Sequence, residues 1–216
     1  MITELILATR NRHKGEELTV LLSHLGVTIR TLADFPEAPE VEEDGATCEA
    51  NAIKKALEIS RATGLAAVAD DTGLEVDALG GRPGVYAARY AGEGATYEDN
   101  CRKLIQELAG VPRNRRTARF VTVAALVVPG KQIQVAQGTL DGYITEIPSG
   151  SHGFGYDPVF YVPELSATLA ELTAEQKNRI SHRAKAFQRV REFLQGQNSD
   201  CSVPTRNSTS PSHVGA

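Results

Sequence analysis

Two adjacent carboxylates, Asp70 and Asp71, directly follow an apolar run. At the end of a strand, such a pair repels itself unless a cation or hydrogen-bond donors compensate. Oxygen ligands in this position suit Mg²⁺, which commonly takes one or two protein carboxylates together with substrate phosphates. Glu42 and Glu43, in an acidic loop earlier in the chain, could complete the site. A turn aspartate that caps backbone groups would leave the same pattern, but the preceding strand favours a metal site.

A polar and basic segment lies between the first expected strand and the first expected helix. It consists of Thr9, Arg10, Asn11, Arg12, His13 and Lys14. A helix N-terminus offers free backbone N–H groups and the positive end of the helix dipole. Together with the Lys14 ammonium and the Asn11 amide, these groups could hold phosphates without a glycine-rich loop. The alternative is an ordinary capped turn with solvated cations.

Two later segments carry groups that could recognise a nucleotide base. The first is the glycine-bearing run Phe154, Gly155, Tyr156 and Asp157, followed by Pro158. Its glycines allow close approach of the backbone, its aromatic rings could stack on a base, and its aspartate could read a base edge. The second is Lys177 with Ser181, His182 and Arg183, where a spacing of four places Lys177 and Ser181 on one helix face. Taken separately, these segments also fit a hairpin with a core phenylalanine and a solvated basic face.

The elements that would position these residues alternate along the chain. Apolar runs predict strands over 2–8, 27–32, 66–69, 74–79, 120–128, 133–143 and 159–161. Helical spacing predicts helices over 14–25, 47–62 with Thr47 as N-cap, 96–109 and 173–195. This alternation indicates an α/β fold with a mixed sheet. Residues 1–195 form the predicted domain, and residues 196–216, rich in serine, asparagine, proline and threonine, form a predicted disordered tail.

Composition excludes several classes of protein. The chain has 216 residues, a formal net charge of −4 and a sequence pI of about 5.8, so no basic nucleic-acid footprint is expected. The start of the chain lacks the pattern of a signal peptide, and no apolar run is long enough to cross a membrane. Three cysteines without a short paired spacing exclude a disulfide framework and suit a reducing compartment. We therefore expect a cytoplasmic protein that binds neither membranes nor nucleic acids.

In combination and in this order, the motifs resemble the inosine triphosphate pyrophosphatase family, whose members remove dITP and XTP. The resemblance covers about residues 2–195. The N-terminal segments that carry it are residues 6–11 with Lys14, residues 42–45 with Asn51 and Lys55, and residues 69–74. The later segments are residues 80–90, residues 153–158, and residues 171–173 with Lys177 and residues 181–183. Each motif is weak by itself, but the ordered set is specific.

The resemblance implies hydrolysis of purine nucleoside triphosphates with a 6-oxo base (ITP, dITP and XTP) to the monophosphate and pyrophosphate. It also implies Mg²⁺ dependence, a homodimer, and an elongated mixed β-sheet flanked by helices, with two lobes and a central active-site cleft. By match of motif, Asp71 is the catalytic carboxylate, and Glu42 with Asp71 binds the metal. Residues 9–14 hold the triphosphate. The other expected nucleotide contacts are Lys55, Thr72, Phe154, Gly155, Tyr156, Asp157, Lys177, His182 and Arg183.

These assignments lead to a mechanistic hypothesis. Asp71, with Asp70 and Glu42, would place Mg²⁺ and orient a water for attack on the α-phosphorus. The ammonium groups of Lys14, Lys55 and Lys177 would counter the triphosphate charge. Two other readings stay open: a Mg²⁺-dependent pyrophosphatase or phosphatase for another phosphorylated small molecule, and a nucleotide sensor without turnover. The carboxylates argue against a pure sensor, because acids beside a polyanion weaken its binding.

Overall fold

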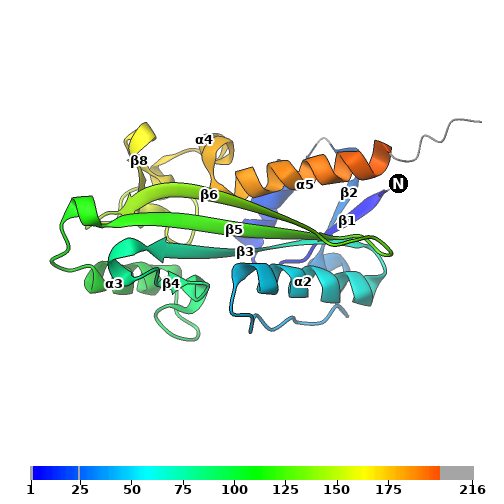
Figure 1. Cartoon of the computed structure of the whole chain (residues 1–216), viewed down its shortest axis with the longest axis horizontal. Helices are drawn as coiled ribbons and strands as arrows, with labels where there is room; N and C mark the ends of the chain where they lie inside the picture. The colour runs from blue at the N-terminus through cyan, green and yellow to red at the C-terminus, as the bar shows by residue number, and fades with distance from the viewer. Residues whose placement is uncertain (1, 24, 200–216) are drawn as a thin grey trace, which may run out of the picture.

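The computed structural model describes residues 2–23 and 25–199, which form a mixed eight-stranded sheet flanked by helices (Figure 1). The strands are β1 (Glu4–Leu7), β2 (Thr28–Thr31), β3 (Ala66–Val76), β4 (Pro83–Gly84), β5 (Thr117–Val127), β6 (Gln134–Ile144), β7 (Phe160–Val162) and β8 (Ala167–Thr168). Their order is β2-β1-β3-β5-β6-β7-β8, with β4 also paired to β3. The α-helices are α1 (Arg12–Leu21), α2 (Cys48–Thr63), α3 (Tyr97–Glu107), α4 (Ala174–Ile180) and α5 (His182–Ser199). The predicted α/β class with a mixed sheet is confirmed.

Three long strands connect the two ends of the molecule. Strands β3, β5 and β6 each have 11 residues, a length of roughly 36 Å at about 3.3 Å per residue. In Figure 1 they run along the long axis, with α2, α5, β1 and β2 around one end and α3, β4 and β8 around the other. The elongated, two-lobed shape therefore results from strands that both lobes share.

The pleat of β3 sends successive side chains into different surroundings. Ala66 and Val68 pack in the core that includes side chains of α1 and α5, whereas Ala67 and Ala69 pack in the core formed with α2. Side chains alternate along a strand. Asp70 therefore faces α1 and α5, and Asp71 faces α2.

One edge of β3 is left open where the carboxylates lie. The parallel pairing with β1 ends at Val68, and the antiparallel pairing with β4 begins at Leu74. Between these points, no strand in the described part of the chain pairs with that edge of β3, while β5 pairs with the other edge throughout. The chain leaves β1 after Leu7 toward α1, so a cleft opens beside residues 69–73.

Several predicted elements differ from the structure. The short strands predicted over 66–69 and 74–79 form one continuous strand that ends at Val76, so Asp70 and Asp71 lie in its interior rather than at its end. The helix predicted over 14–25 ends at Leu21. The helix predicted over 173–195 is broken at Ser181, whose hydroxyl accepts a hydrogen bond from Ala184 N at 3.1 Å and so caps α5. Helix α5 also continues through Ser199, beyond the predicted domain boundary at 195. The rest of the predicted tail, 200–216, lies outside the described residues.

Candidate active site

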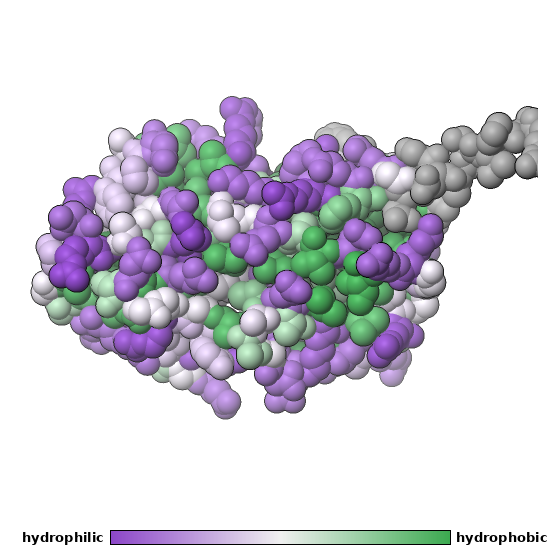
Figure 2. All heavy atoms as spheres, viewed as in Figure 1, coloured by the Kyte–Doolittle hydropathy of each residue, from purple (hydrophilic) through white to green (hydrophobic). Residues whose placement is uncertain are grey.

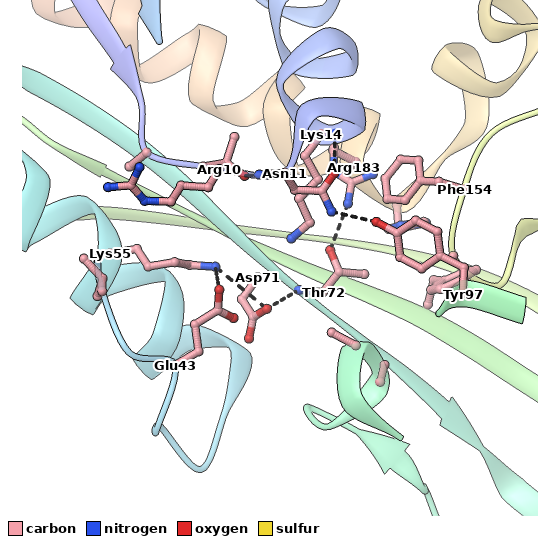
Figure 3. Close-up of a pocket in the computed structure, with 18 of the residues that line it drawn as sticks. Arg10, Asn11, Lys14, Glu43, Lys55, Asp71, Thr72, Tyr97, Phe154 and Arg183 are labelled. Atoms are coloured by element: carbon pink, nitrogen blue, oxygen red, sulfur yellow. Dashed lines mark hydrogen bonds and ion pairs between the residues drawn. The ribbon is translucent and has the colours of Figure 1, made fainter. Parts of the chain in front are cut away.

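A cavity of about 280 Å³ opens at the free edge of β3, between the two lobes (Figure 3). Its walls come from the β1–α1 connection, the acidic loop before α2, strand β3, the N-terminal part of α3, the loop before β7, and the junction of α4 and α5. Residues distant in sequence therefore meet around one space, as the combined motifs predicted.

The Asp71 carboxylate is held from two directions, and its residue is 5% exposed. One oxygen accepts a hydrogen bond from Asn51 Nδ2 at 3.0 Å, and the other accepts one from the backbone N of Thr72 at 2.9 Å. Asn51 Oδ1 also accepts a hydrogen bond from Gly45 N at 2.8 Å, which ties the acidic loop to the same point. These bonds fix the carboxylate at the cavity wall, 4.0 Å from Lys55 Nζ.

Asp70 has a different environment on the other side of the strand. Its Oδ2 lies 3.3 Å from Lys14 Nζ and 3.2 Å from Arg183 Nε. Burial raises the pKa of Asp70, but the charges of Lys14, Arg183 and Lys55 outweigh burial and hold that pKa well below its ordinary value. Asp70 Oδ1 is buried and has no hydrogen-bond partner among the described residues. Asp70 is therefore a charged anchor for cations of the cleft and does not line the cavity.

One end of the cavity is basic and faces a helix N-terminus. Asn11 caps α1, with its Oδ1 accepting a hydrogen bond from Lys14 N at 3.2 Å. Lys55 Nζ donates to Glu43 Oε1 at 3.0 Å and to the Asp70 carbonyl at 2.7 Å. Arg10 extends to the same end and donates to the carbonyl of Ala38 at 3.0 Å. Cationic groups and first-turn N–H groups of this kind suit an anion.

The other end joins α1 to α4 and α5 through a nearly buried carboxylate. Glu17 Oε1 accepts a hydrogen bond from Lys177 Nζ, and Glu17 Oε2 accepts one from Arg183 Nη1, both at 2.7 Å. Burial raises the pKa of Glu17, but these two cations outweigh it, so the pKa lies below its ordinary value. Lys177 Nζ also donates to Asp157 Oδ2 at 2.6 Å. Lys177 and Arg183 therefore reach the cavity already paired with acids.

An aromatic ring and a neutral imidazole complete this end. Lys177 Nζ and Arg183 Cζ lie 4.9 and 5.5 Å from the centroid of the Phe154 ring. His182 stacks on Phe120 at 4.4 Å. Burial, together with the charges of Arg183 and Lys177, lowers the pKa of His182 well below its ordinary value, so its imidazole is neutral at pH 7. Its buried Nδ1 has no partner within the described part of the chain.

The functional groups thus follow one another along the cavity. Figure 3 shows Arg10, Lys55 and Glu43 on one side, Asp71 and Thr72 in the middle, and Phe154 and Tyr97 on the other side. A basic end, a central carboxylate and an aromatic end form an elongated site for a ligand that carries phosphates on one side and a ring on the other.

Comparison with known proteins identifies the family. Residues 5–193 match the model of the Ham1 family, a range that contains every residue of the cavity. This chain belongs to the Ham1 family. Among Ham1 relatives, a dITP/XTP pyrophosphatase of Geobacillus kaustophilus is 51% identical over 189 residues, covering 88% of this chain and 93% of that protein.

Solved Ham1 structures share the fold. The Ham1 protein of Staphylococcus aureus superposes with a TM-score of 0.81 at 39% identity, covering 90% of this chain and all of that one. A nucleoside-triphosphatase and dITP/XTP pyrophosphatase of Mycobacterium abscessus superposes with a TM-score of 0.71 at 44% identity, covering 87% of this chain and 98% of that one. The two-lobed mixed sheet is therefore the Ham1 fold.

Most of the predicted site residues of this Ham1 chain line the cavity. They are Thr9, Arg10, Asn11, Lys14, Lys55, Asp71, Thr72, Phe154, Gly155, Tyr156, Asp157, Lys177, His182 and Arg183. Arg12, His13 and Glu42 do not line it, and all three are exposed. Their roles in binding substrate or metal stay predictions, although Glu43, the neighbour of Glu42, does line the cavity.

Two contributors did not stand out in the sequence. Glu17 follows Lys14 by three residues on α1, so helical spacing could have placed both side chains on one face toward the cleft. Tyr97 is the first residue of α3 and lines the cavity from the other lobe. Its position carried no signal, because nothing in the sequence around it resembles a binding motif.

Proposed function

We propose that this protein hydrolyses purine nucleoside triphosphates with a 6-oxo base (ITP, dITP and XTP) to the nucleoside monophosphate and pyrophosphate. Its Ham1 relatives named dITP/XTP pyrophosphatase are about half identical to it over nearly the whole domain. The observation that carries the proposal is the position of Asp71 between the basic end and the aromatic end of one cavity. That position suits cleavage of the bond between the α-phosphate, which is attached to the nucleoside, and the β-phosphate.

The two ends of the cavity bind different parts of the substrate in this proposal. The β- and γ-phosphates lie at the first turn of α1, against Lys14, Lys55 and Arg10. The base stacks on Phe154. Lys177, first expected to counter the triphosphate, belongs to the base end, because it lies over the Phe154 ring. The α-phosphate then falls beside Asp71.

Asp71 acts as the general base. Its carboxylate is fixed by Asn51 and by the backbone of Thr72, so it needs little reorientation to accept a proton from a water at the α-phosphorus. Attack by this water breaks the bond to the bridging oxygen of the β-phosphate. The cations at the basic end stabilise the negative charge that leaves with pyrophosphate.

Selection of the base follows from the donors at the aromatic end. A 6-oxo group accepts hydrogen bonds, and the Lys177 and Arg183 cations over Phe154 can donate them. A 6-amino group is itself a donor, so it could not accept hydrogen bonds from these cations, and buried polar groups would be left unpaired. His182 Nδ1 has no partner among the described residues, and this neutral imidazole can satisfy a further polar atom of the base.

The donor set also fits a divalent cation. The described residues contain no group of three or more His, Cys, Asp and Glu side chains placed to hold a metal by themselves. Asp71 and Glu43 nevertheless both line the cavity near Lys55, and Mg²⁺ commonly takes one or two carboxylates with phosphate oxygens completing its shell. We therefore propose Mg²⁺ bound by Asp71 and Glu43 with the substrate. When bound, it neutralises phosphate charge and polarises the phosphoryl oxygens.

The test is the Asp71→Asn variant assayed for pyrophosphate release from dITP with Mg²⁺. Loss of the base is expected to lower kcat by about 100-fold or more. Asp44→Asn is the matched control, because Asp44 is exposed and pairs with Lys54 at the surface. If Asp71→Asn kept a kcat near that of the wild type, Asp71 would not be the general base. Equal kcat/KM values for dITP and dATP would contradict the base selection, and full activity in EDTA would contradict the metal.

The proposed setting of this activity is the cytoplasm, where the chain acts as a homodimer. No described helix combines the length and apolarity that a membrane span requires. Cys48 and Cys101 are free thiols, which suits a reducing compartment. Figure 2 shows apolar surface gathered between α5 and α2, over the β5–β6 hairpin, which supports contact with a second copy. Light scattering that gives the mass of a monomer at micromolar concentration would contradict the dimer.

A further inference from the structure

We propose that His13 and Tyr97 are positioning residues that hold the Phe154 ring in the plane on which the base stacks. This inference rests on the proposed function, because it concerns how the base end of the same cavity is made rigid. It also assigns His13 a role different from the phosphate contact expected for residues 9–14. Neither ring has to touch the phosphates for this role.

The three rings form one contact cluster. The His13 and Phe154 rings are stacked, with centroids 5.4 Å apart and an angle of 14° between their planes. The Tyr97 ring lies 5.8 Å from Phe154 and 6.4 Å from His13, tilted against both. Distances and tilts of this kind are those in which aromatic pairs stabilise each other.

His13 supports Phe154 from the solvent side. His13 is exposed and does not line the cavity, whereas Phe154 does. The cations of Lys177 and Arg183 also lie 4.9 and 5.5 Å from the centroid of the Phe154 ring, and both of these residues are buried. In this inference the imidazole backs one face of the ring, and the base stacks on the other face, beside the two cations.

The cluster is also tied across the mouth of the cleft. Asn11 Nδ2 donates a hydrogen bond to the Tyr97 hydroxyl at 2.8 Å. Asn11 is the N-cap of α1, and Tyr97 begins α3, which Thr96 caps from the other lobe. Two helix starts, each fixed by its own cap, therefore hold Tyr97 and His13 in place.

Phe154 needs such support because its own backbone constrains it little. Gly153 and Gly155 flank it, both at positive φ. On the backbone side, the Phe154 N–H donates to Asp157 Oδ2 at 2.9 Å, which fixes the peptide but not the ring. The orientation of the ring is set by what packs on it, so the supporting rings set the plane of the base relative to Asp71.

The first test measures KM and kcat for ITP in the wild type, His13→Ala and His13→Phe. Loss of the stacked ring is expected to raise KM about three- to tenfold, with kcat within about twofold of the wild type. The phenyl ring of His13→Phe restores stacking and should return KM to the wild-type value. Glu16→Ala is the matched control, because Glu16 is exposed on the same helix and pairs with Arg12 at the surface.

The second test is independent of catalysis. The chain contains no tryptophan, so a Phe154→Trp variant carries a single fluorescent indole at the site. Adding His13→Ala or Tyr97→Leu to this variant should lower the anisotropy of the indole and raise its quenching by acrylamide. Adding Glu16→Ala, the control of the first test, should change neither quantity.

The outcomes separate this inference from the proposed function. If the wild type did not hydrolyse ITP but the fluorescence changes were still present, the proposed function would be refuted. The support of the Phe154 ring by His13 and Tyr97 would still stand. An unchanged KM in His13→Ala would overturn the inference. A lower KM would overturn it as well, because His13 would then cover the stacking surface instead of backing it. Unchanged fluorescence in both double variants would have the same consequence.

Discussion

Replacing Glu17 by glutamine tests whether a carboxylate outside the predicted motifs holds the base end together. Glu17 bridges Lys177 and Arg183 with one oxygen each, and its side chain is 17% exposed. Glutamine keeps the shape but loses the charge and one of the two acceptors. Both cations would then depend on their second carboxylates, Asp157 for Lys177 and Asp70 for Arg183.

The size of the effect follows from these second partners. Removing one member of a buried ion pair commonly costs about 3–5 kcal/mol, because the other charge stays buried alone. Here neither cation is left alone, so a loss of about 2–3 kcal/mol in the free energy of unfolding is expected. In a domain of this size, that corresponds to a fall in Tm of roughly 4–12 °C.

The effect should also depend on pH in a defined direction. The folded-state pKa of Glu17 lies below its ordinary value of 4.5. The stability that the charged carboxylate contributes is therefore complete above about pH 4.5 and is lost as the pH falls through the lowered pKa. The difference between wild type and Glu17→Gln should be constant from pH 6 to 8 and shrink in more acidic solution.

Urea unfolding at several pH values measures both quantities. The control is Glu16→Gln, one residue earlier on α1, where the carboxylate pairs with exposed Arg12. Surface pairs of this kind contribute little, so its unfolding curve should overlay that of the wild type. If Glu17→Gln overlaid the wild type too, or if its deficit grew toward low pH, the bridge would not stabilise the protein as described.

Further predictions concern glycines and Mg²⁺. A methyl group at Gly138 would collide with backbone atoms of α5 at His182, so Gly138→Ala should lower the free energy of unfolding by at least about 2 kcal/mol, measured by urea titration. Gly196→Ala, in an open part of the same helix, should instead raise it by about 0.5–1 kcal/mol. Gly153→Ala would displace Asp157 and strain a positive φ, so KM for ITP should rise more than kcat falls. Removal of Mg²⁺ with EDTA should abolish turnover, and the far-ultraviolet circular dichroism should stay unchanged.

The elements that local patterns describe well were predicted from sequence. Helix α2 begins after Thr47, whose hydroxyl accepts a hydrogen bond from Ala50 N at 3.1 Å, as its capping pattern indicated. The continuity of β3 was not predicted, because Asp70 and Asp71 read as the end of an apolar strand. Their burial depends on partners distant in the chain, such as Arg183, which is 113 residues from Asp70. No local pattern contains such compensation.

The candidate site likewise has features that the sequence predicts and features that it does not. Its main segments could be predicted because each combines residue types that chemistry restricts, such as an acid pair or a glycine-bearing aromatic loop. Which member of a segment faces the cleft could not, because that depends on the local path of the backbone. Glu42 and Glu43 illustrate the point: they are adjacent and chemically alike, yet Glu43 lines the cavity and Glu42 is exposed.

The pleat of one strand explains how a single acid pair serves two purposes. Asp71 faces α2 and reaches Asn51, whereas Asp70 faces the opposite side and reaches Arg183 of α5. Both faces meet at the short stretch of β3 where one edge pairs with no described strand, so a ligand in the cleft contacts groups from both sides of the sheet. A shift of β3 by one residue would turn each carboxylate to the opposite face of the sheet. If Asp71 took the place of Asp70, the proposed base would be buried among the cations, and Thr72 would lie in the place of Asp71 beside Asn51. The site therefore depends on the register of β3 against β5 as much as on the identity of its acids.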